Sequence, residues 1–464
     1  MYTCGPTVYD YASIGNMWSY LTADILRRYL EYSGYEVRLV KNITDVGHFT
    51  DDDILEVSGE DKMEKAARRE KKAPLELAEH YTQYYLADEK SLNIKPSHYQ
   101  PRPTKEIPEM IGITENLVKK GLAYETEDGV YFSVHTFPHY GRLSGNTLDQ
   151  IKAGARVTVN ENKKDPADFA LWKKLVGANA KHSLWWDSPW GKGFPGWHLE
   201  CTAMAVKYLG DSIDIHTGGE DNIFPHHECE IAQSESYTGK PFVKYWVHTR
   251  HFQVAGQKMS KSLGNIYTVG AVPDGRYKSL VELDYSPLAF RMLKLSTHYR
   301  SKSNFTFEGL DQAAKNWKKI NEVYQRLGEY AEEKSGNTIL DVAAYRVRFE
   351  IALDDDLNTA EALAVLLDLV KYANQLMDKE YLQNAKEVQK LIKSFDQVFA
   401  VLDRKAFEKN KEDIPGKVKK LADEREAARQ AKDFSKADRL REKISQLGYE
   451  IADTETGHSI SKKN

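Results

Sequence analysis

The sequence predicts an α/β protein with a doubly wound parallel sheet, interrupted by an insertion and followed by a mostly helical region. Three observations support this prediction. A strand, a turn, a helix and a second strand follow one another between residues 2 and 43. A second α/β pattern returns at 212–236, after a long stretch without that alternation. Beyond residue 304 the apolar residues recur almost entirely at helical spacing.

The first α/β unit begins with a short strand that ends at Cys4, before a Gly-Pro turn. Apolar and aromatic residues three and four apart then predict a helix over 16–33. Asn16 is suited to cap the start of this helix, and Gly34 to follow its end. A stretch rich in Val and Leu at 36–43 predicts the next strand.

The alternation of strands and helices stops at residues 95–190, which we interpret as an insertion. This stretch predicts a helix over 106–120, a short strand pair near Tyr131 and polar loops. The α/β pattern then resumes with a strand at 212–216, a Gly-Gly turn and a helix over about 224–236. The sheet domain is therefore expected in two parts that flank the insertion.

The end of the chain predicts a basic helical hairpin. Two helices flank a turn at 433–435, with Ser435 as the expected N-cap of the second, which ends at Gly448. Residues 401–464 carry 16 Lys and Arg against 13 Asp and Glu, a net charge of +3. Either a nucleic-acid contact or an ordinary solvated charged face explains this pattern.

The composition is that of an ordinary soluble protein, with 41% apolar and 29% charged residues in 464. No run approaches the roughly 18 apolar residues of a membrane-spanning helix, and the first residues lack a signal-peptide pattern, so we expect a cytoplasmic protein. Three scattered cysteines exclude a disulfide framework, and none forms a Cys-x-x-Cys pair. The net charge of −4 means that an RNA partner must meet a local basic patch.

His226 and Glu230 lie four residues apart on a predicted helix, so both side chains leave from one face. An imidazole and a carboxylate at that spacing can bind a metal ion, but most such pairs are surface hydrogen bonds. Cys4 and Cys201 could complete a site with two sulfurs, one nitrogen and one oxygen, which suits zinc. Spacing alone leaves open that both cysteines are small buried hydrophobic residues.

Two glycine-containing segments are candidates for nucleotide binding. Lys258-Met259-Ser260-Lys261-Ser262 lies between two glycines, and its lysines could close over a polyphosphate, although such a segment is usually a surface loop. Gly218 and Gly219 follow a predicted strand, at the edge where a parallel sheet binds ligands. Glycines there would let adenosine approach the backbone, or would simply form a turn.

These motifs make the chain similar to the bacterial-type cysteinyl-tRNA synthetases over essentially its whole length. The Lys-Met-Ser-Lys-Ser signature of class I synthetases is present without change. The other matches follow in the family's order and at fitting separations: Cys4 to Asp10, Asn42 to Asp45, Gly196 to Cys201 and Phe224 to Glu228. Five motifs in register make the resemblance highly specific.

The resemblance implies one zinc ion per chain, held by Cys4, Cys201, His226 and Glu230, with Cys229 left as a structural residue. The substrate cysteine would bind this zinc through its own thiolate, which a serine hydroxyl does not match. A metal–thiolate bond can therefore supply selectivity that shape alone cannot. The remaining substrate-pocket residues that the resemblance implies are Gly5, Thr44, Trp197 and His216.

The implied reaction uses ATP with Mg²⁺ in two steps. The carboxylate of L-cysteine attacks the α-phosphorus to give an adenylate, and cysteine then passes to the 3′ end of tRNA(Cys). Charge development would be steadied by Lys258, Lys261 and the helix start, to which Asn16 and Ser13 belong. The ATP site is expected to consist of Gly15, Gly218, Gly219, Asp221 and Lys261.

Two departures from the family pattern affect these expectations. The second class I signature reads Ser13-Ile14-Gly15-Asn16, with serine where relatives have histidine. A serine hydroxyl is shorter than imidazole and carries no positive charge. The activation barrier is therefore expected to rise by up to ~2–4 kcal/mol, and the rate to fall. Relatives also carry a first strand ahead of the position of Tyr2, so this start is expected to be truncated or misassigned.

The resemblance also implies a division of the chain into five parts and a monomer in solution. The expected parts are a first catalytic half (1–94), a connective insertion (95–190), a second catalytic half (191–303), a helical anticodon-binding domain (304–412) and a small helical hairpin (413–464).

Two alternatives to the synthetase remain. One is a cysteine ligase that acts on an amino sugar, although such relatives lack most of the helical region after residue 304. The other is a catalytically impaired RNA-binding paralogue, marked by Ser13.

Overall fold

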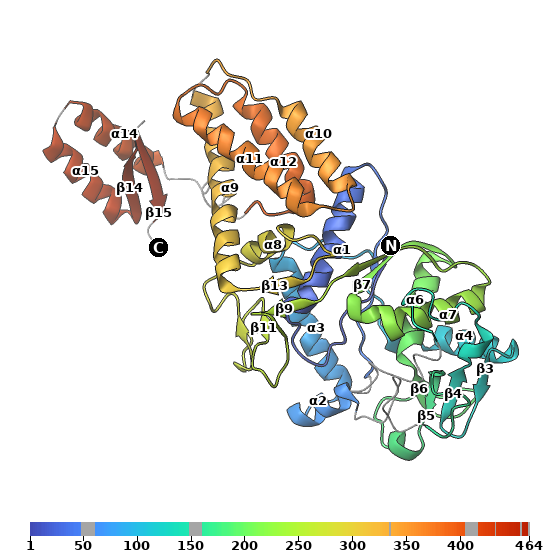
Figure 1. The fold of residues 1–464 in the computed structure, drawn as a ribbon. Helices are drawn as coiled ribbons and strands as arrows, with labels where there is room; N and C mark the ends of the chain where they lie inside the picture. The colour runs from blue at the N-terminus through green and yellow to red at the C-terminus, as the bar shows by residue number, and fades with distance from the viewer. Residues whose placement is uncertain are drawn as a thin grey trace. The chain divides into compact units, whose positions relative to one another are not determined.

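The computed structural model describes residues 1–47, 61–147, 160–333, 336–403, 416–431, 433–454 and 457–462. The chain forms two compact units, Met1–Val401 and Leu402–Asn464. Figure 1 shows the elements of each unit. Among the described helices, none is long and apolar enough to cross a membrane.

A four-stranded parallel sheet lies at the centre of the first unit. Its strands are β1 (Tyr2–Thr3), β2 (Val40–Lys41), β7 (Ile213–Gly219) and β8 (Val243–Thr249), in the order β2-β1-β7-β8. Helix α1 (Ile14–Tyr32) lies on one side of the sheet, and α6 (Trp197–Leu209) and α7 (Glu228–Thr238) lie on the other (Figure 1). The predicted fold class, a doubly wound parallel α/β sheet, is confirmed.

The N-cap of helix α1 (Ile14–Tyr32) lies three residues earlier than its sequence suggests. Ser13 is the N-cap: its side chain accepts the Asn16 N–H, and the Asn16 side chain accepts the Ser13 N–H at 2.9 Å. The expectation that Asn16 is the N-cap was therefore wrong, because Asn16 is the third residue of a reciprocal capping box. Gly34 follows the helix with a φ of +91°, as predicted for a residue at that position.

Both α/β units depart from their predicted boundaries. The strand expected at 36–43 is only Val40–Lys41. The helix expected from 224 is α7, which is preceded by a π-helical turn at Ile223–His227. Phe224 has extended backbone angles within this turn, and Pro225 has no N–H to donate to a helix. The turn sets the direction in which the following histidines leave the backbone.

The insertion is a small α/β layer of its own. Helix α4 (Ile107–Lys119) packs with an antiparallel sheet in the order β3-β4-β5-β6, whose strands are Ala123–Glu125, Gly129–Phe132, Phe169–Lys174 and Gly193–Pro195. Its apolar core includes Leu199 and Ala203 of α6 and Cys229 and Ala232 of α7. The insertion therefore shares its core with the helices that carry the candidate metal ligands.

A second group of short elements packs around residues 258–262, which we call the lysine-serine loop. Strands β9 (Phe252–Val254) and β10 (Gln257–Lys258) form a tight hairpin in which Ala255 and Gly256 have φ values of +49° and +76°. Two positive φ values fit the hairpin's right-handed twist. The neighbouring elements are α2 (Lys62–Glu70), α3 (Pro74–Ser91), β11 (Tyr267–Thr268), β12 (Lys278–Ser279), α8 (Pro287–Leu295) and β13 (Ser303–Phe305).

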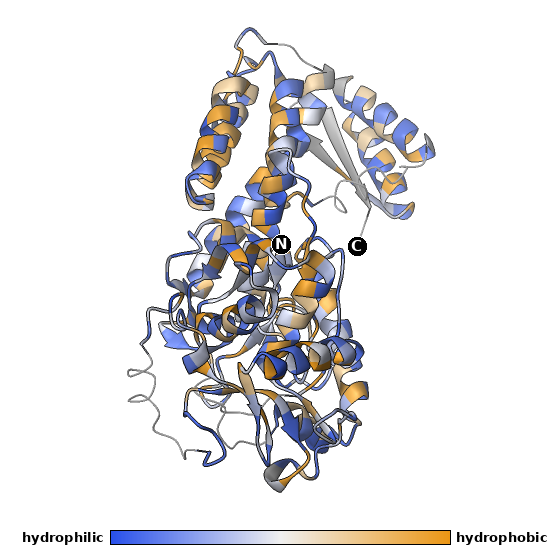
Figure 2. Cartoon of the chain, turned by 90° about the vertical axis from the view of Figure 1, so that its right-hand side faces the viewer, coloured by the Kyte–Doolittle hydropathy of each residue, from blue (hydrophilic) through white to orange (hydrophobic). Residues whose placement is uncertain are grey.

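The region after Phe305 is helical, as predicted. It contains α9 (Phe307–Glu333), α10 (Val342–Asp354), α11 (Thr359–Asp378) and α12 (Ala385–Phe399). Asn358 caps α11 by accepting the Glu361 N–H, and the buried face of α11 includes Leu363 and Leu366. Figure 2 shows the apolar and polar stripes of these amphipathic helices. Short 3₁₀ helices occur at Pro103–Lys105, Val134–Thr136, Gly177–Asn179 and Glu220–Asn222.

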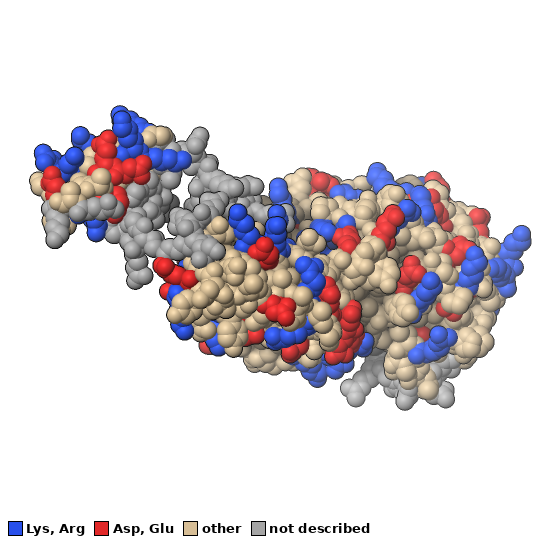
Figure 3. All heavy atoms as spheres, turned by 90° about the horizontal axis from the view of Figure 1, so that it is seen from above, with Lys and Arg blue, Asp and Glu red and all other residues tan. Residues whose placement is uncertain are grey.

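The second unit contains the two expected helices, α14 (Gly416–Gln430) and α15 (Phe434–Gln446), and an antiparallel strand pair, β14 (Tyr449–Thr454) and β15 (Gly457–Lys462). Asp433 is the N-cap of α15, because its carboxylate accepts the Lys436 N–H at 3.0 Å. The prediction of Ser435 as the N-cap was wrong by two residues. Lysine and arginine side chains are spread over the described surface of this unit among acidic ones (Figure 3).

Candidate active site and metal centre

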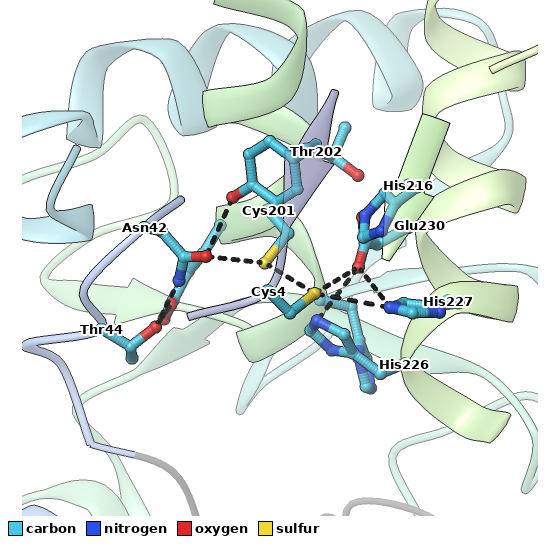
Figure 4. A network of polar contacts seen from close by, with 12 residues as sticks. Cys4, Asn42, Thr44, Cys201, Thr202, His216, His226, His227 and Glu230 are labelled. Carbon is cyan, nitrogen blue, oxygen red and sulfur yellow. Dashed lines mark hydrogen bonds and ion pairs between the residues drawn. The ribbon is translucent and has the colours of Figure 1, made fainter. Parts of the chain in front are cut away.

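Four side chains that are far apart in the sequence meet at the carboxyl end of β1. Cys4 follows β1, Cys201 lies on α6, His226 lies in the π-helical turn and Glu230 lies on the first turn of α7. Their ligand atoms all lie within 4.8 Å of one another (Figure 4). The two sulfurs are 3.8 Å apart, and His226 Nε2 lies 3.0 Å from Glu230 Oε1. The structure thus brings the four predicted ligands together.

This donor set fits zinc. Two thiols, one imidazole and one carboxylate are ligand types that Zn²⁺ accepts in a tetrahedral site. Tetrahedral Zn–S bonds of about 2.3 Å would place two sulfurs about 3.8 Å apart, which matches the observed separation of Cys4 and Cys201. Cys201, His226 and Glu230 are each no more than 2% exposed, so the ligand atoms are held by packing rather than by solvent.

Three further histidines contact the four candidate ligands. His216 Nε2 bonds Glu230 Oε2 at 3.0 Å, and His198 Nδ1 lies 2.9 Å from His226 Nδ1. His227 Nε2 lies 3.4 Å from Cys4 Sγ. Cys4, His216, His227 and Glu230 form an alternative group within ligand distance. Of these three histidines, only His216 was predicted from the sequence; the adjacent pair at 226–227 was the signal that could have pointed to His227.

Charge is distributed unevenly within the cluster. Burial alone would raise the pKa of the Glu230 carboxyl, but His216 and His226 hold it well below its usual range. Burial opposes a charge on His226, yet Glu230 and Cys201 raise its pKa to about 10. A hydrogen bond from Cys4 lowers the pKa of Cys201 to about 6, whereas burial and Cys201 raise the pKa of Cys4. The Glu230 carboxylate and the readily formed Cys201 thiolate are therefore directed toward the same position among the four candidate ligands.

A cavity of about 790 Å³ opens beside the cluster. It lies between the start of α1, the carboxyl end of β7 and the β9–β10 hairpin. Eleven of the residues predicted for the metal, catalytic, substrate and nucleotide sites line it. They are Cys4, Gly5, Ser13, Gly15, Asn16, Trp197, Gly218, Gly219, Asp221, Lys258 and Lys261.

Thr44 and His216 were also predicted for the pocket, but neither lines the cavity. Both are buried beside it: Thr44 accepts a hydrogen bond from Asn42 at 2.8 Å, and His216 bonds Glu230. Asn42, which the sequence did not single out as a site residue, also accepts the Gly5 N–H at 2.8 Å. Trp197 stacks on the ring of His226, with centroids 4.3 Å apart. The metal cluster and cavity wall are thus continuous.

The two class I signatures are in contact. A Cβ added at Gly15 would lie 2.3 Å from Met259 Cε, so the methionine of the lysine-serine loop packs directly on the start of α1. Ser13 Oγ donates to Asn16 Oδ1 at 2.8 Å, so both side chains are engaged in the helix cap. The loop that carries Lys258 and Lys261 therefore covers the helix N-terminus, where the partial positive charge of the helix favours anions.

The Gly-Gly turn lies at the carboxyl end of β7. A Cβ at Gly218 would lie 2.7 Å from His227 Cε1, whereas one at Gly219 would meet only Ser19 Oγ, at 3.7 Å. Glycine at 218 is therefore required by the histidine beneath it. Asp221 is exposed, and its carboxylate lies 3.3 Å from His251 Nδ1.

Comparisons with known proteins identify two families and a set of relatives. The family described as the tRNA synthetases class I (C) catalytic domain matches residues 1–315, and the DALR domain matches residues 348–403. The cysteine–tRNA ligase of Chlorobaculum tepidum is 43% identical over all of this chain and 94% of its own length. That of Thermus thermophilus is 41% identical over 98% of this chain and 93% of its own.

A solved structure shows the same fold at low sequence identity. The Mycobacterium tuberculosis methionyl-tRNA synthetase, in complex with methionyl-adenylate, has a TM-score of 0.58 and 14% identity. The match covers 86% of this chain and 89% of that one.

Proposed function

The chain belongs to the cysteine–tRNA ligases of the class I (C) synthetase family, and from that premise we propose that it activates L-cysteine with ATP and transfers it to tRNA(Cys), with zinc selecting the substrate thiol. The observation that carries this proposal is the meeting of two thiols, an imidazole and a carboxylate at the edge of a nucleotide-sized cavity. Synthetase activity follows from the family, and the roles of individual residues are our proposal.

Cys4, Cys201, His226 and Glu230 would hold the zinc. When bound, zinc supplies a soft partner for the thiolate of the substrate, which a hydroxyl does not replace. His216 and His198 orient Glu230 and His226 through the hydrogen bonds at 3.0 and 2.9 Å. Hydrogen bonds of this kind to a metal ligand fix its orientation and tune its basicity. Selection of cysteine over serine would therefore rest on this cluster together with the histidines around it.

The chain's own groups position the reacting carboxylate and ATP. Trp197 stacks on His226 and lines the cavity, so it supplies an apolar wall next to the substrate side chain. The ATP phosphates, with Mg²⁺, would lie between the α1 N-terminus and Lys258 and Lys261. These charges would stabilise the in-line transition state through position and electrostatics. Ser13 contributes through the helix cap, because its hydroxyl is bonded to Asn16.

The helical region would contact tRNA. Helices α10 to α12 overlap the DALR match at 348–403, which favours a tRNA acceptor over an amino sugar. The second unit has a net charge of +3 in a chain of net charge −4, since residues 401–464 have 16 Lys and Arg against 13 Asp and Glu. Phosphate contacts from such a unit need no overall positive charge on the chain.

Exchange of labelled pyrophosphate into ATP tests the activation step. We expect exchange with cysteine, none with serine, and loss of exchange together with zinc in a Cys201→Ala variant. A Cys229→Ala variant is the matched control, because Cys229 packs in the insertion core rather than in the cluster. Absence of exchange in a folded, zinc-loaded protein would overturn the proposal and favour a non-catalytic RNA-binding role.

A further inference from the structure

The second lysine of the lysine-serine loop is engaged by an acidic residue of another segment. Lys261 Nζ lies 2.5 Å from Asp10 Oδ2, 251 residues away in the sequence. The Lys261 side chain is 54% exposed, whereas that of Asp10 is 8% exposed. Both residues line the 790 Å³ cavity. The carboxylate is therefore fixed in the cavity wall, and the lysine is the partner that can move.

The loop keeps its shape through bonds of its own. Asn265 accepts the Ser260 N–H at 2.9 Å and donates to the Lys258 carbonyl at 3.2 Å. These bonds tie the two ends of the loop together without using the Lys261 side chain. Departure of Lys261 from Asp10 would thus leave the loop intact, and the lysine side chain can turn independently of the backbone.

Asp10 would keep hydrogen-bond donors after Lys261 leaves. The Tyr277 hydroxyl donates to Oδ2 at 2.8 Å, and Arg276 donates to Oδ1 at 3.1 Å. Arg276 is itself held by Glu70 at 3.0 Å and by Asp274 at 2.7 Å. A largely buried carboxylate that lost all its donors would be strongly destabilised. The Tyr11 N–H also donates to Oδ1, at 2.9 Å. These three remaining donors make exchange of the lysine feasible.

The ion pair competes with the ligand that the proposed function assigns to the loop. Lys261 carries a single positive charge, so its ion pair with Asp10 competes with an ion pair between the same ammonium and a triphosphate. We propose that Asp10 is a positioning residue that holds Lys261 at the cavity wall when no nucleotide is bound and releases it to the terminal phosphates of ATP. This inference rests on the proposed function.

Binding of Mg·ATP and of AMP, without cysteine, tests the proposal by titration calorimetry. Asp10→Asn keeps the side-chain shape and an acceptor for Tyr277 but removes the charge that holds Lys261. Half-exposed ion pairs are worth a fraction of a kcal/mol to about 1 kcal/mol, so the Kd for Mg·ATP should fall by about 2- to 5-fold. AMP lacks the terminal phosphates, and its Kd should not change.

Two further variants separate this role from a general effect of charge or folding. Asp274→Asn removes a carboxylate from the same Arg276 but not from Lys261, so it should leave the Kd for Mg·ATP unchanged. In a Lys261→Ala background, Asp10→Asn should have a much smaller effect than in the wild type, because the partner is gone.

The binding measurements distinguish failure of the positioning role from failure of the proposed function. The proposal is overturned if Asp10→Asn leaves or weakens Mg·ATP affinity, if AMP affinity changes equally, or if the effect is undiminished without Lys261. A wild-type protein that binds no Mg·ATP would overturn the proposed function along with it. Binding of Mg·ATP that is insensitive to Asp10→Asn would overturn the positioning role alone.

Discussion

His216 Nε2 and Glu230 Oε2 are 3.0 Å apart, and neither residue has measurable side-chain exposure. The other oxygen of the same carboxylate faces His226, at 3.0 Å. Glu230 is thus held from two sides by imidazoles that reach it from β7 and from the π-helical turn. The orientation of this carboxylate toward the two cysteine sulfurs depends on a residue that is not in the predicted ligand set.

Replacing His216 by Ala should weaken zinc binding by about 10- to 100-fold, the usual cost of losing a hydrogen-bond partner of a metal ligand. Glu230 would lose the hydrogen bond that fixes one oxygen and would be free to rotate away from the cluster. Competition with a chromophoric chelator measures the affinity. His251→Ala is the control, because His251 is exposed and pairs with Glu220 and Asp221 instead; an equal loss in both variants would contradict the assignment.

Gly5→Ala should unfold or displace the loop that carries Cys4. A Cβ at this position would lie 1.6 Å from the Asn42 carbonyl oxygen, which is backbone and cannot move aside cheaply. We expect a loss of at least about 2 kcal/mol of stability, seen as a lower melting temperature, and reduced zinc content. Gly219→Ala is the matched control, since its nearest neighbour is at 3.7 Å; a comparable loss there would show that the clash at Gly5 is not the cause.

Part of this site could be predicted from the sequence because its signals are local. The i, i+4 spacing of His226 and Glu230 on a helix fixes their common face without knowledge of the fold. The meeting of Cys4 with Cys201 could not be derived in that way, because it depends on β1 lying beside β7 in a parallel sheet with α6 packed against it. That pairing entered the prediction only through resemblance to a family.

Residues that act through distant partners were missed. Asp10, Asn42, His227 and His248 contact the loop, the turn or the cluster from other segments, and no periodicity marks them. The errors at helix starts have a local cause. Capping residues occur in clusters at a helix start, and sequence alone does not say which of two candidates, such as Ser13 and Asn16, takes the N-cap position.

Ser13→Ala should reduce stability by about 1 kcal/mol, the typical value of an N-cap side chain. The Ser13 hydroxyl is bonded to Asn16, so its removal should reduce the pyrophosphate exchange rate far less than Lys261→Ala does. Ser286→Ala provides a matched control, because Ser286 caps α8 by accepting the Leu288 N–H. It should cost similar stability without changing exchange. A collapse of exchange in Ser13→Ala alone would assign the hydroxyl a direct role in catalysis.

Asp88 predicts a pH dependence of stability that one substitution should remove. Its carboxylate, on α3, accepts the Gly270 N–H at 2.9 Å, and burial raises its pKa to about 7. Between the ordinary pKa near 4 and this value the folded protein binds more protons than the unfolded chain, so stability falls as pH rises through that window. Asp88→Asn keeps an acceptor for Gly270 and should raise the melting temperature at pH 8, where wild-type Asp88 is charged.

The gain should be on the order of 2–4 kcal/mol at pH 8 and should shrink toward pH 5, because the wild-type carboxyl is then protonated in the folded state. Asp24→Asn should change the stability in the opposite direction and serves as the control. Burial would raise its pKa, but Arg291 and Arg28 hold it below its usual range, so Asp24→Asn should destabilise the protein at neutral pH. Melting curves of both variants, recorded from pH 5 to pH 8, test this pH dependence. A gain for Asp88→Asn that does not depend on pH would show that burial of the charge is not its source.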